Sequence, residues 1–198
     1  MKKNLILMVC ALLLTGLSSC STDDNEADDM DNIRQLVLRN DGSVLGGEVY
    51  GDRSRETDTS DPLAVFFREE LHNPRWDGYG NEHKTFFEQG NYDDEKCIMI
   101  NSRQEFQNAY MGTKTLPEVD FDTYTLIIGR TWGNDSSWEL ALVALRDDGD
   151  NYELETKLYH HVDWVALAAI TTIHYWRLYP KRASKNIVIK RTVENVKD

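Results

Sequence analysis

Basic side chains, cysteines and long apolar runs are all scarce in this sequence of 198 residues. Lysine and arginine number 22 against 34 aspartates and glutamates, which gives a formal net charge of −12. A chain this acidic lacks the basic face that phosphate binding needs, which argues against nucleic acid as a partner. The three cysteines, Cys10, Cys20 and Cys97, are too few for a disulfide scaffold. The apolar run Leu5–Leu17 has 13 residues, whereas about 20 are needed to span a bilayer.

The first 20 residues have the pattern of a bacterial lipoprotein signal. Lys2 and Lys3 precede the apolar run, which ends in Leu17-Ser18-Ser19-Cys20. An aliphatic residue, two small residues and a cysteine resemble a lipobox, where the signal peptide is removed and the cysteine is acylated. The resemblance implies that residues 1–19 are a signal peptide and that Cys20 carries palmitate-type acyl chains. The alternative is an ordinary signal peptide that happens to contain a cysteine.

An acidic segment follows Cys20, and we expect residues 20–32 to form the lipidated cysteine and a tether. Six of the 12 residues from 21 to 32 are acidic, so this segment cannot bury enough apolar surface to fold. Ser21 stands where an aspartate would resemble an inner-membrane retention signal, and this favours the outer membrane. The acidic segment also resembles an export signal that sends lipoproteins to the cell surface. A plain solvated linker on a periplasm-facing protein is the alternative.

Residues 33–198 are expected to form one α+β domain with a predominantly antiparallel, sandwich-like β-sheet and one or two short helices. The apolar fraction of 40% argues against disorder. Residues 33–96 are expected to be irregular, with a short strand at 33–38 and a loop over 51–61, which has no apolar side chain. Residues 97–198 are expected to be regular and rich in sheet, because short turns between successive strands predict antiparallel pairing.

Two helix starts are recognisable from their capping residues. Ser60 or Asp61 precedes Pro62, a pattern typical of an N-cap followed by proline in the first turn. The apolar stripe of this helix is supplied by Leu63, Phe66, Phe67 and Leu71. The second start is a capping box at Ser102 and Glu105, which predicts a short helix that reaches Tyr110.

The strand candidates of the regular part follow one another closely. Residues 138–146 are apolar on both faces, so this candidate is expected to be a central strand. Residues 147–151 have the composition of a turn. The strands are expected at 97–100, 123–132, 138–146, 152–159, 171–179 and 187–193.

The regular part resembles a known family. Ile100-Asn101-Ser102 opens a helix, then Leu116-Pro117-Glu118-Val119-Asp120-Phe121 leads into a hydrophobic strand. This order is similar to the C-terminal domain of PrcB-like lipoproteins, which are subunits of bacterial surface protease complexes. The resemblance covers residues 97–193 and implies association with a partner protein. The family usually has a Thr-Gly-Gly-Tyr-like turn after its first long strand, where this chain has one glycine, Gly133.

Aromatic side chains near loops are the first candidates for binding. Arg75, Trp76 and Tyr79 are predicted to contact a partner, because aromatic and arginine side chains on a loop are common anchors of interfaces. The alternative is that Phe86 and Phe87, in the same segment, pack inward and the rest of it is solvated. The other rings, which either line the core or bind, are Trp132, Trp138, Trp164, Tyr175 and Trp176.

No catalytic residue, metal ligand or cofactor is predicted. The two histidines of His160-His161-x-Asp163 are adjacent, and adjacent residues of a strand point to opposite faces, so they cannot readily share an ion. Cys97 lies in an apolar run and is expected to be a buried structural cysteine. No nucleophile motif or metal-site spacing is present. A pair of catalytic carboxylates, as in glycoside hydrolases, is defined by its separation in space, so the sequence does not identify one among 34 acidic residues.

Three functions remain open from the sequence. The first is a non-catalytic lipoprotein, anchored through Cys20, that binds a protein or forms a complex such as a surface protease assembly. The second is a glycan-binding surface lipoprotein, since flat rings can stack on sugars. The third is a hydrolase.

Overall fold

The computed structural model describes residues 41–50, 53–56, 60–71, 85–87, 94–168 and 170–197. The predicted signal peptide, Cys20, the acidic tether and the expected strand at 33–38 lie outside these residues. Within the described ranges no helix is long and apolar enough to cross a membrane. The elements are β1 (Leu45–Tyr50), β2 (Arg53–Glu56), α2 (Pro62–Glu70), β3 (Lys96–Ile100), α3 (Arg103–Ala109), β4 (Tyr124–Gly133), β5 (Trp138–Asp147), β6 (Asn151–His161), β7 (Thr171–Pro180) and β8 (Asn186–Val196).

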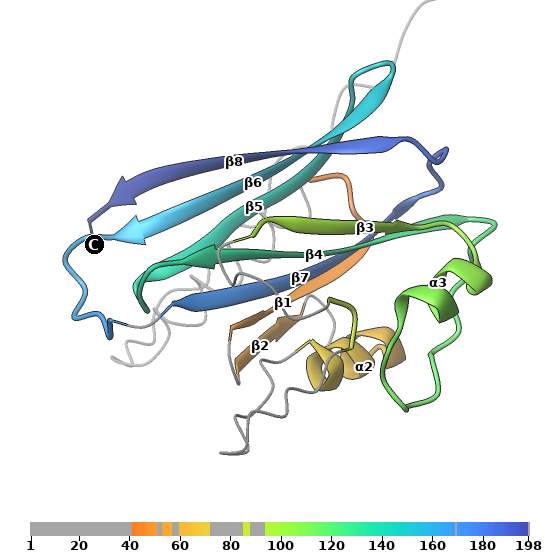
Figure 1. Ribbon diagram of the computed structural model, residues 1–198, viewed down its shortest axis with the longest axis horizontal. Coiled ribbons are helices and arrows are strands. Elements are labelled where there is room, and N and C mark those ends of the chain that lie inside the picture. Colours follow the sequence, from red (N-terminus) through yellow and green to blue (C-terminus); the bar gives the residue numbers. More distant parts are fainter. Residues whose placement is uncertain are drawn as a thin grey trace, which may run out of the picture.

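The elements form three layers, with two helices, a five-stranded sheet and a three-stranded sheet (Figure 1). The five-stranded sheet has the order β2-β1-β7-β4-β3, and the three-stranded sheet has the order β5-β6-β8. All pairs in the larger sheet are antiparallel. The predicted α+β class, with predominantly antiparallel, sandwich-like sheets and two short helices, is therefore confirmed.

Both helices begin at the predicted residues. Asp61 is the N-cap of α2, where its Oδ1 accepts a hydrogen bond of 2.7 Å from the amide of Leu63, and proline occupies the first turn. Ser102 caps α3 and accepts from the amide of Glu105 at 3.1 Å. The Glu105 carboxylate in turn accepts from the amide of Asn101, so both side chains satisfy backbone donors at the helix start.

The central five-stranded sheet is covered on both faces. On one face the predicted apolar stripe of α2 packs against Leu126 and Ile128 of β4 and Trp176 of β7. On the other face Ile127 of β4 and Tyr175 of β7 pack against the three-stranded sheet. Alternate residues of the same strands thus serve two cores, as the two-residue period of a strand requires.

Two expectations about the strands were wrong. Strand β5 lies at an end of its sheet and is not central. Strict alternation was also expected to place Leu140 and Leu142 on one face and Val143 and Leu145 on the other, but a β-bulge between Leu140 and Leu142 shifts the register. Leu140 faces the core before the bulge, and Val143 and Leu145 face it afterwards.

Strands β6 and β8 form a parallel pair, but they are not successive in the chain. The successive strands that pair, such as β5 and β6, are antiparallel as expected. The chain leaves the smaller sheet after β6, crosses to the larger sheet as β7 and returns as β8. Two reversals give β8 the direction of β6. The predicted turn at 147–151 is confirmed between β5 and β6, where Gly149 has a φ of +79° that favours glycine.

The region expected to be irregular contains two strands. Residues 53–56 form β2, although they were expected to lie in a loop, and β1 was not expected as a strand. Strand β1 contains two glycines and a glutamate, and β2 has no apolar residue. Neither therefore has the alternating pattern that identifies a strand from sequence. Backbone pairing with β7 and β1, respectively, holds them in the sheet.

A buried arginine links β1 to β7. The Arg177 guanidinium donates to Asp41 at 3.0 Å and to Glu48 at 2.6 Å, and its Nη1 donates to the carbonyl of Gly47 at 3.0 Å. The side chain is 1% exposed and its two acidic partners are nearly as buried. The pKa of Arg177 is raised, because the attraction of Glu48 and Asp41 exceeds the desolvation that opposes it. The guanidinium is therefore permanently charged.

Replacement of Arg177 by methionine is expected to lower the free energy of unfolding by about 3–5 kcal/mol, because two buried carboxylates lose their partner. Urea unfolding followed by circular dichroism measures this difference. Lys190→Met is the control, since Lys190 pairs with Glu153 at an exposed position and should cost less than about 1 kcal/mol. Equal losses in the two variants would contradict the assigned role of Arg177.

Candidate functional site

The predicted binding residues Arg75, Trp76 and Tyr79 lie outside the described residues. Residues 85–87 of the same segment are described: Phe86 is buried in the core against the helices, and Phe87 packs against that core. These two rings therefore pack inward, which is the alternative that the sequence left open.

Of the remaining candidate rings, Trp164 is exposed and the other four divide into two groups. Tyr175 and Trp176 are fully buried and belong to the two cores. Trp132 and Trp138 lie at the two ends of the turn between β4 and β5, where they are half-buried. They form, with His160 and Arg191, what we call the tryptophan cluster.

The tryptophan cluster is a stack of flat groups from four strands. The Arg191 guanidinium of β8 lies 4.7 Å from the centroid of the Trp132 ring and 5.5 Å from that of Trp138. The Trp138 ring stacks on His160 of β6, with centroids 4.7 Å apart and planes 14° apart. Arg191 also donates to the carbonyl of Trp132 at 2.8 Å. These contacts hold the four side chains in one arrangement.

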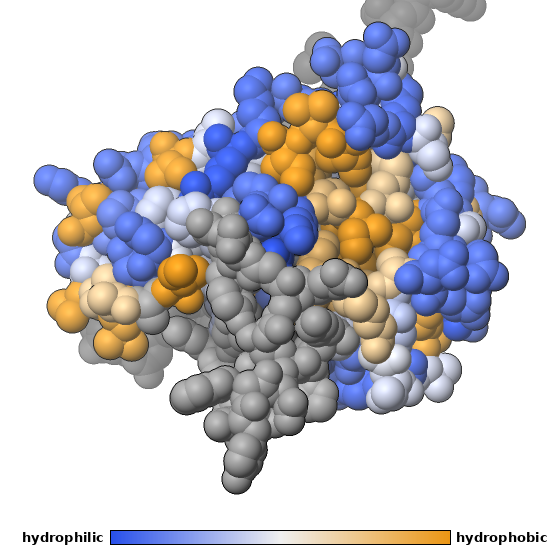
Figure 2. All heavy atoms as spheres, in the orientation of Figure 1, coloured by the Kyte–Doolittle hydropathy of each residue, from blue (hydrophilic) through white to orange (hydrophobic). Residues whose placement is uncertain are grey.

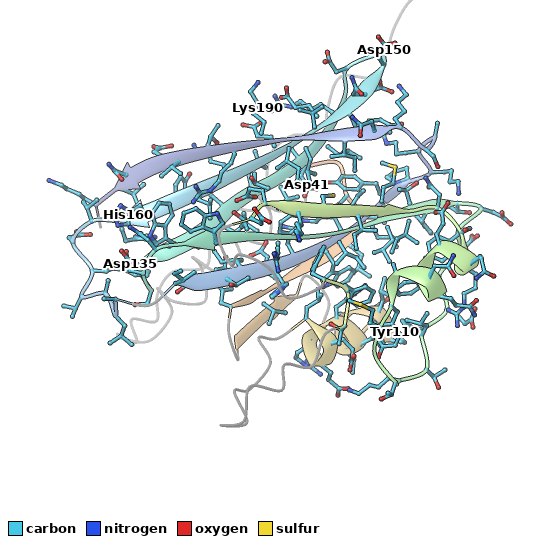
Figure 3. All side chains as sticks on the ribbon, in the orientation of Figure 1. Asp41, Tyr110, Asp135, Asp150, His160 and Lys190 are labelled. Carbon is cyan, nitrogen blue, oxygen red and sulfur yellow. The ribbon has the colours of Figure 1, made fainter. Side chains whose placement is uncertain are left out.

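Acidic residues lie at two sides of the cluster. The Glu95 carboxylate lies 3.3 Å from Arg191 Nε, and Asp135 lies 3.8 Å from His160 Nε2. Figure 3 places Asp135 and His160 at the same end of the sheets. Desolvation raises the pKa of Asp135, but hydrogen bonds from Ser137 outweigh it and leave this pKa below its ordinary value. Asp135 is therefore a carboxylate at neutral pH.

The side chains of the cluster are partly exposed to solvent and are also held in fixed orientations. Side-chain exposure is 24% for Arg191, 28% for His160 and 21% for Asp135. The indole of Trp138 donates to Asn134 at 2.7 Å, which fixes its orientation. Each group is partly desolvated and still reachable from solvent, and interface residues that bind strongly share this property.

The two adjacent histidines point to opposite faces of β6, as predicted. His160 faces the tryptophan cluster, whereas His161 is buried with its Nε2 3.1 Å from Glu139 and its ring stacked on Trp164 at 3.8 Å. In the described part of the chain, no three side chains among histidine, cysteine, aspartate and glutamate are grouped so that they could hold a metal ion.

Cys97 is half-buried against the core between the sheets and forms no disulfide. Burial raises the pKa of its thiol to about 12. The thiol is therefore protonated at neutral pH and is a weak nucleophile. These features fit the predicted structural role, although the residue is less buried than the sequence implied.

Sequence reasoning did not identify Glu95, Asp135 or Arg191 as site residues. Glu95 directly precedes β3, Asp135 lies in the turn after β4 and Arg191 lies on β8, and no spacing links them. The pairing of β3 with β4, and of β6 with β5 and β8, brings them together. Comparison with protein-family models, with curated protein sequences and with solved structures finds no match for this chain.

The acidity of Glu95 gives a test of the cluster. Burial raises the pKa of Glu95 above its ordinary value of about 4.5, against the opposing effects of a hydrogen bond from Thr131 and of the Arg191 charge. The folded chain therefore holds this proton to a higher pH than the unfolded chain. The resulting stability is present below the unfolded pKa and is lost as the pH rises through the folded pKa.

The free energy of unfolding of the wild type, minus that of Glu95→Gln, is therefore expected to fall as the pH rises from about 4.5 to 7. Glutamine retains an acceptor for Thr131 but has no proton to lose in this range. Urea unfolding of both proteins at a series of pH values measures the difference. A difference that stays constant or rises with pH would contradict the assigned environment of Glu95.

Proposed function

We propose that this chain is a lipid-anchored, non-catalytic module that binds a protein partner through the tryptophan cluster. The observation that carries the proposal is the partly exposed stack of Trp132, Arg191, Trp138 and His160. Tryptophan and arginine are the residues most enriched where protein interfaces gain their affinity. Because the stack is already ordered, a partner that docks on it loses little conformational freedom of these side chains.

The cluster favours a protein over a glycan as the ligand. Sugars bind aromatic residues by stacking on an open ring face. The Trp138 ring has His160 on it at 4.7 Å and Arg191 at 5.5 Å, and Arg191 also lies over Trp132. A partner would therefore meet rings that are already covered on at least one face, a guanidinium and the carboxylates of Glu95 and Asp135, which suit the mixed polar and apolar surface of a protein.

Glu95 and Asp135 are held by hydrogen bonds from neighbouring residues, which supports a fixed binding surface rather than catalysis. Glu95 accepts from Thr131 at 2.6 Å and pairs with Arg191. Asp135 accepts from the amide of Ser137 at 2.8 Å. These contacts keep the rings and charges in place. The partner class implied by the sequence resemblance is a surface protease complex.

The anchor is the second part of the proposal. Cys20 would hold the chain at the outer membrane, facing the cell exterior, and the 20 residues from 21 to 40 precede the described part of the chain. A chain of this length reaches at most about 70 Å. The domain would therefore stay close to the membrane that carries its anchor.

Arg191→Gln is expected to reduce partner capture from native membranes by about tenfold or more, because it removes the charge that lies between the two indoles. Capture is measured by cross-linking tagged protein in intact cells and quantifying the co-purified partner. Lys190→Gln is the matched control, since it removes the same charge from the neighbouring residue of β8, which is exposed and pairs with the half-buried Glu153. Equal capture by both variants and the wild type would refute the proposed site.

Cys20→Ala is expected to abolish incorporation of labelled palmitate and to leave residues 1–19 attached, because both steps of lipoprotein processing act at this cysteine. Mass spectrometry of the purified protein identifies the N-terminus. Cys10→Ala is the control and should be labelled and processed like the wild type, since Cys10 lies within the apolar run. Palmitate labelling that persists in Cys20→Ala would show that the anchor is elsewhere.

A further inference from the structure

The connection between β6 and β7 exposes an unusual number of large apolar side chains. From Trp164 to Ile170 the sequence contains no polar side chain. Val165 is fully exposed, Leu167 is 74% exposed and Trp164 is 44% exposed. We call the described residues of this connection, 162–168 and 170, the apolar loop. Exposed apolar patches of this kind mark surfaces that contact proteins or membranes.

Contacts with neighbouring elements hold the apolar loop in place. The amide of Leu167 donates to Ser136 Oγ at 2.8 Å, and the amide of Ser136 donates to the Leu167 carbonyl at 3.2 Å. The Trp164 ring stacks on the buried His161. The exposed side chains are therefore presented by a loop that is fixed at two points.

The loop lies at one end of the long axis of the molecule (Figure 1). Figure 2 shows apolar side chains at this end of the view, next to polar ones. The loop projects from the end of the sheets, so its side chains can insert into a lipid surface, which needs no complementary shape. Trp164 lies between the apolar residues and the body of the domain, and tryptophan prefers this position at membrane interfaces.

We propose that the apolar loop contacts the lipid surface to which the chain is anchored, and so gives the domain a second point of attachment. The proposal rests on the anchor at Cys20 in the proposed function and goes beyond it. A lipid surface fits better than a protein because residues 164–170 offer no polar side chain to a partner, whereas protein interfaces have polar rims.

The depth of this contact is limited. The loop backbone carries polar groups that need hydrogen bonds, so only its side chains pass beyond the headgroup boundary. The contact is weak alone, and the anchor makes it effective by keeping the loop at high local concentration near the membrane. Because the chain carries a net charge of −12, neutral lipid should bind it better than anionic lipid.

The test uses residues 21–198, the mature chain without its lipidated cysteine, which contains every described residue. The probe is phosphatidylcholine vesicles with brominated acyl chains, which quench tryptophan fluorescence on contact, and sedimentation gives the bound fraction. The wild type is expected to bind, and Val165→Asp and Leu167→Asp are each expected to reduce binding by about tenfold or more. Val188→Asp is the control, since Val188 is 50% exposed on β8 and pairs with Glu153, near the other end of the sheets.

Three results would overturn the lipid contact: no binding by the wild type, equal binding by the loop variants, or equal loss in Val188→Asp. Circular dichroism and thermal unfolding confirm that each variant is folded. If the vesicle test gave one of these results and Leu167→Asp also lost partner capture, the loop would be assigned to a protein interface instead. Palmitate labelling at Cys20 and capture through Arg191 are separate measurements, so failure of this inference is distinguishable from failure of the proposed function.

Discussion

The buried charge of Arg177 is the constraint on which the larger sheet depends. The guanidinium lies between β1 and β7, and it needs Asp41 and Glu48 to offset the loss of hydration. It also needs space, since a Cβ atom at Gly46 would lie 2.6 Å from its Cδ. Gly46 weakens β1 as a strand, but it leaves the room that Arg177 needs, and the backbone carbonyl of the next residue, Gly47, accepts a hydrogen bond from the guanidinium. Such a network fixes one register between β1 and β7, because any slip would separate buried opposite charges.

The tryptophan cluster follows from the way the chain passes between the two sheets. Strand β4 belongs to the larger sheet and the next strand, β5, belongs to the smaller one. The turn between these two strands brings Trp132 and Trp138 close together. Arg191 joins the cluster from the middle of β8, where it pairs with Thr156 of β6. Its long side chain reaches Trp132 and Trp138, whereas His160 lies four residues further along β6. The cluster therefore depends on side chains that both sheets supply.

The elements that could be predicted from the sequence are those determined by residues close to one another in the chain. Asp61 with Pro62, and Ser102 with Glu105, identify helix starts through contacts within a few residues. Strands β4, β6, β7 and β8 were recognisable from their apolar pattern. The strands β1 and β2 were missed because long-range backbone pairing holds them. The bulge in β5 and its place at the edge depend on its partner. The site residues Glu95, Asp135 and Arg191 could not be found, since only the register of separate strands unites them.

The turn at residues 134–137 connects the two surfaces that we propose. Asn134 and Asp135 contact Trp138 and His160 of the tryptophan cluster, and Ser136 makes two hydrogen bonds with the apolar loop. A loop resting on lipid would therefore place the tryptophan cluster within one turn of the membrane surface. A partner that docks there would lie beside the same membrane, which suits a partner that is itself anchored or embedded in it. The two proposed contacts are then parts of one arrangement, in which the lipid surface orients the domain and the tryptophan cluster meets the partner.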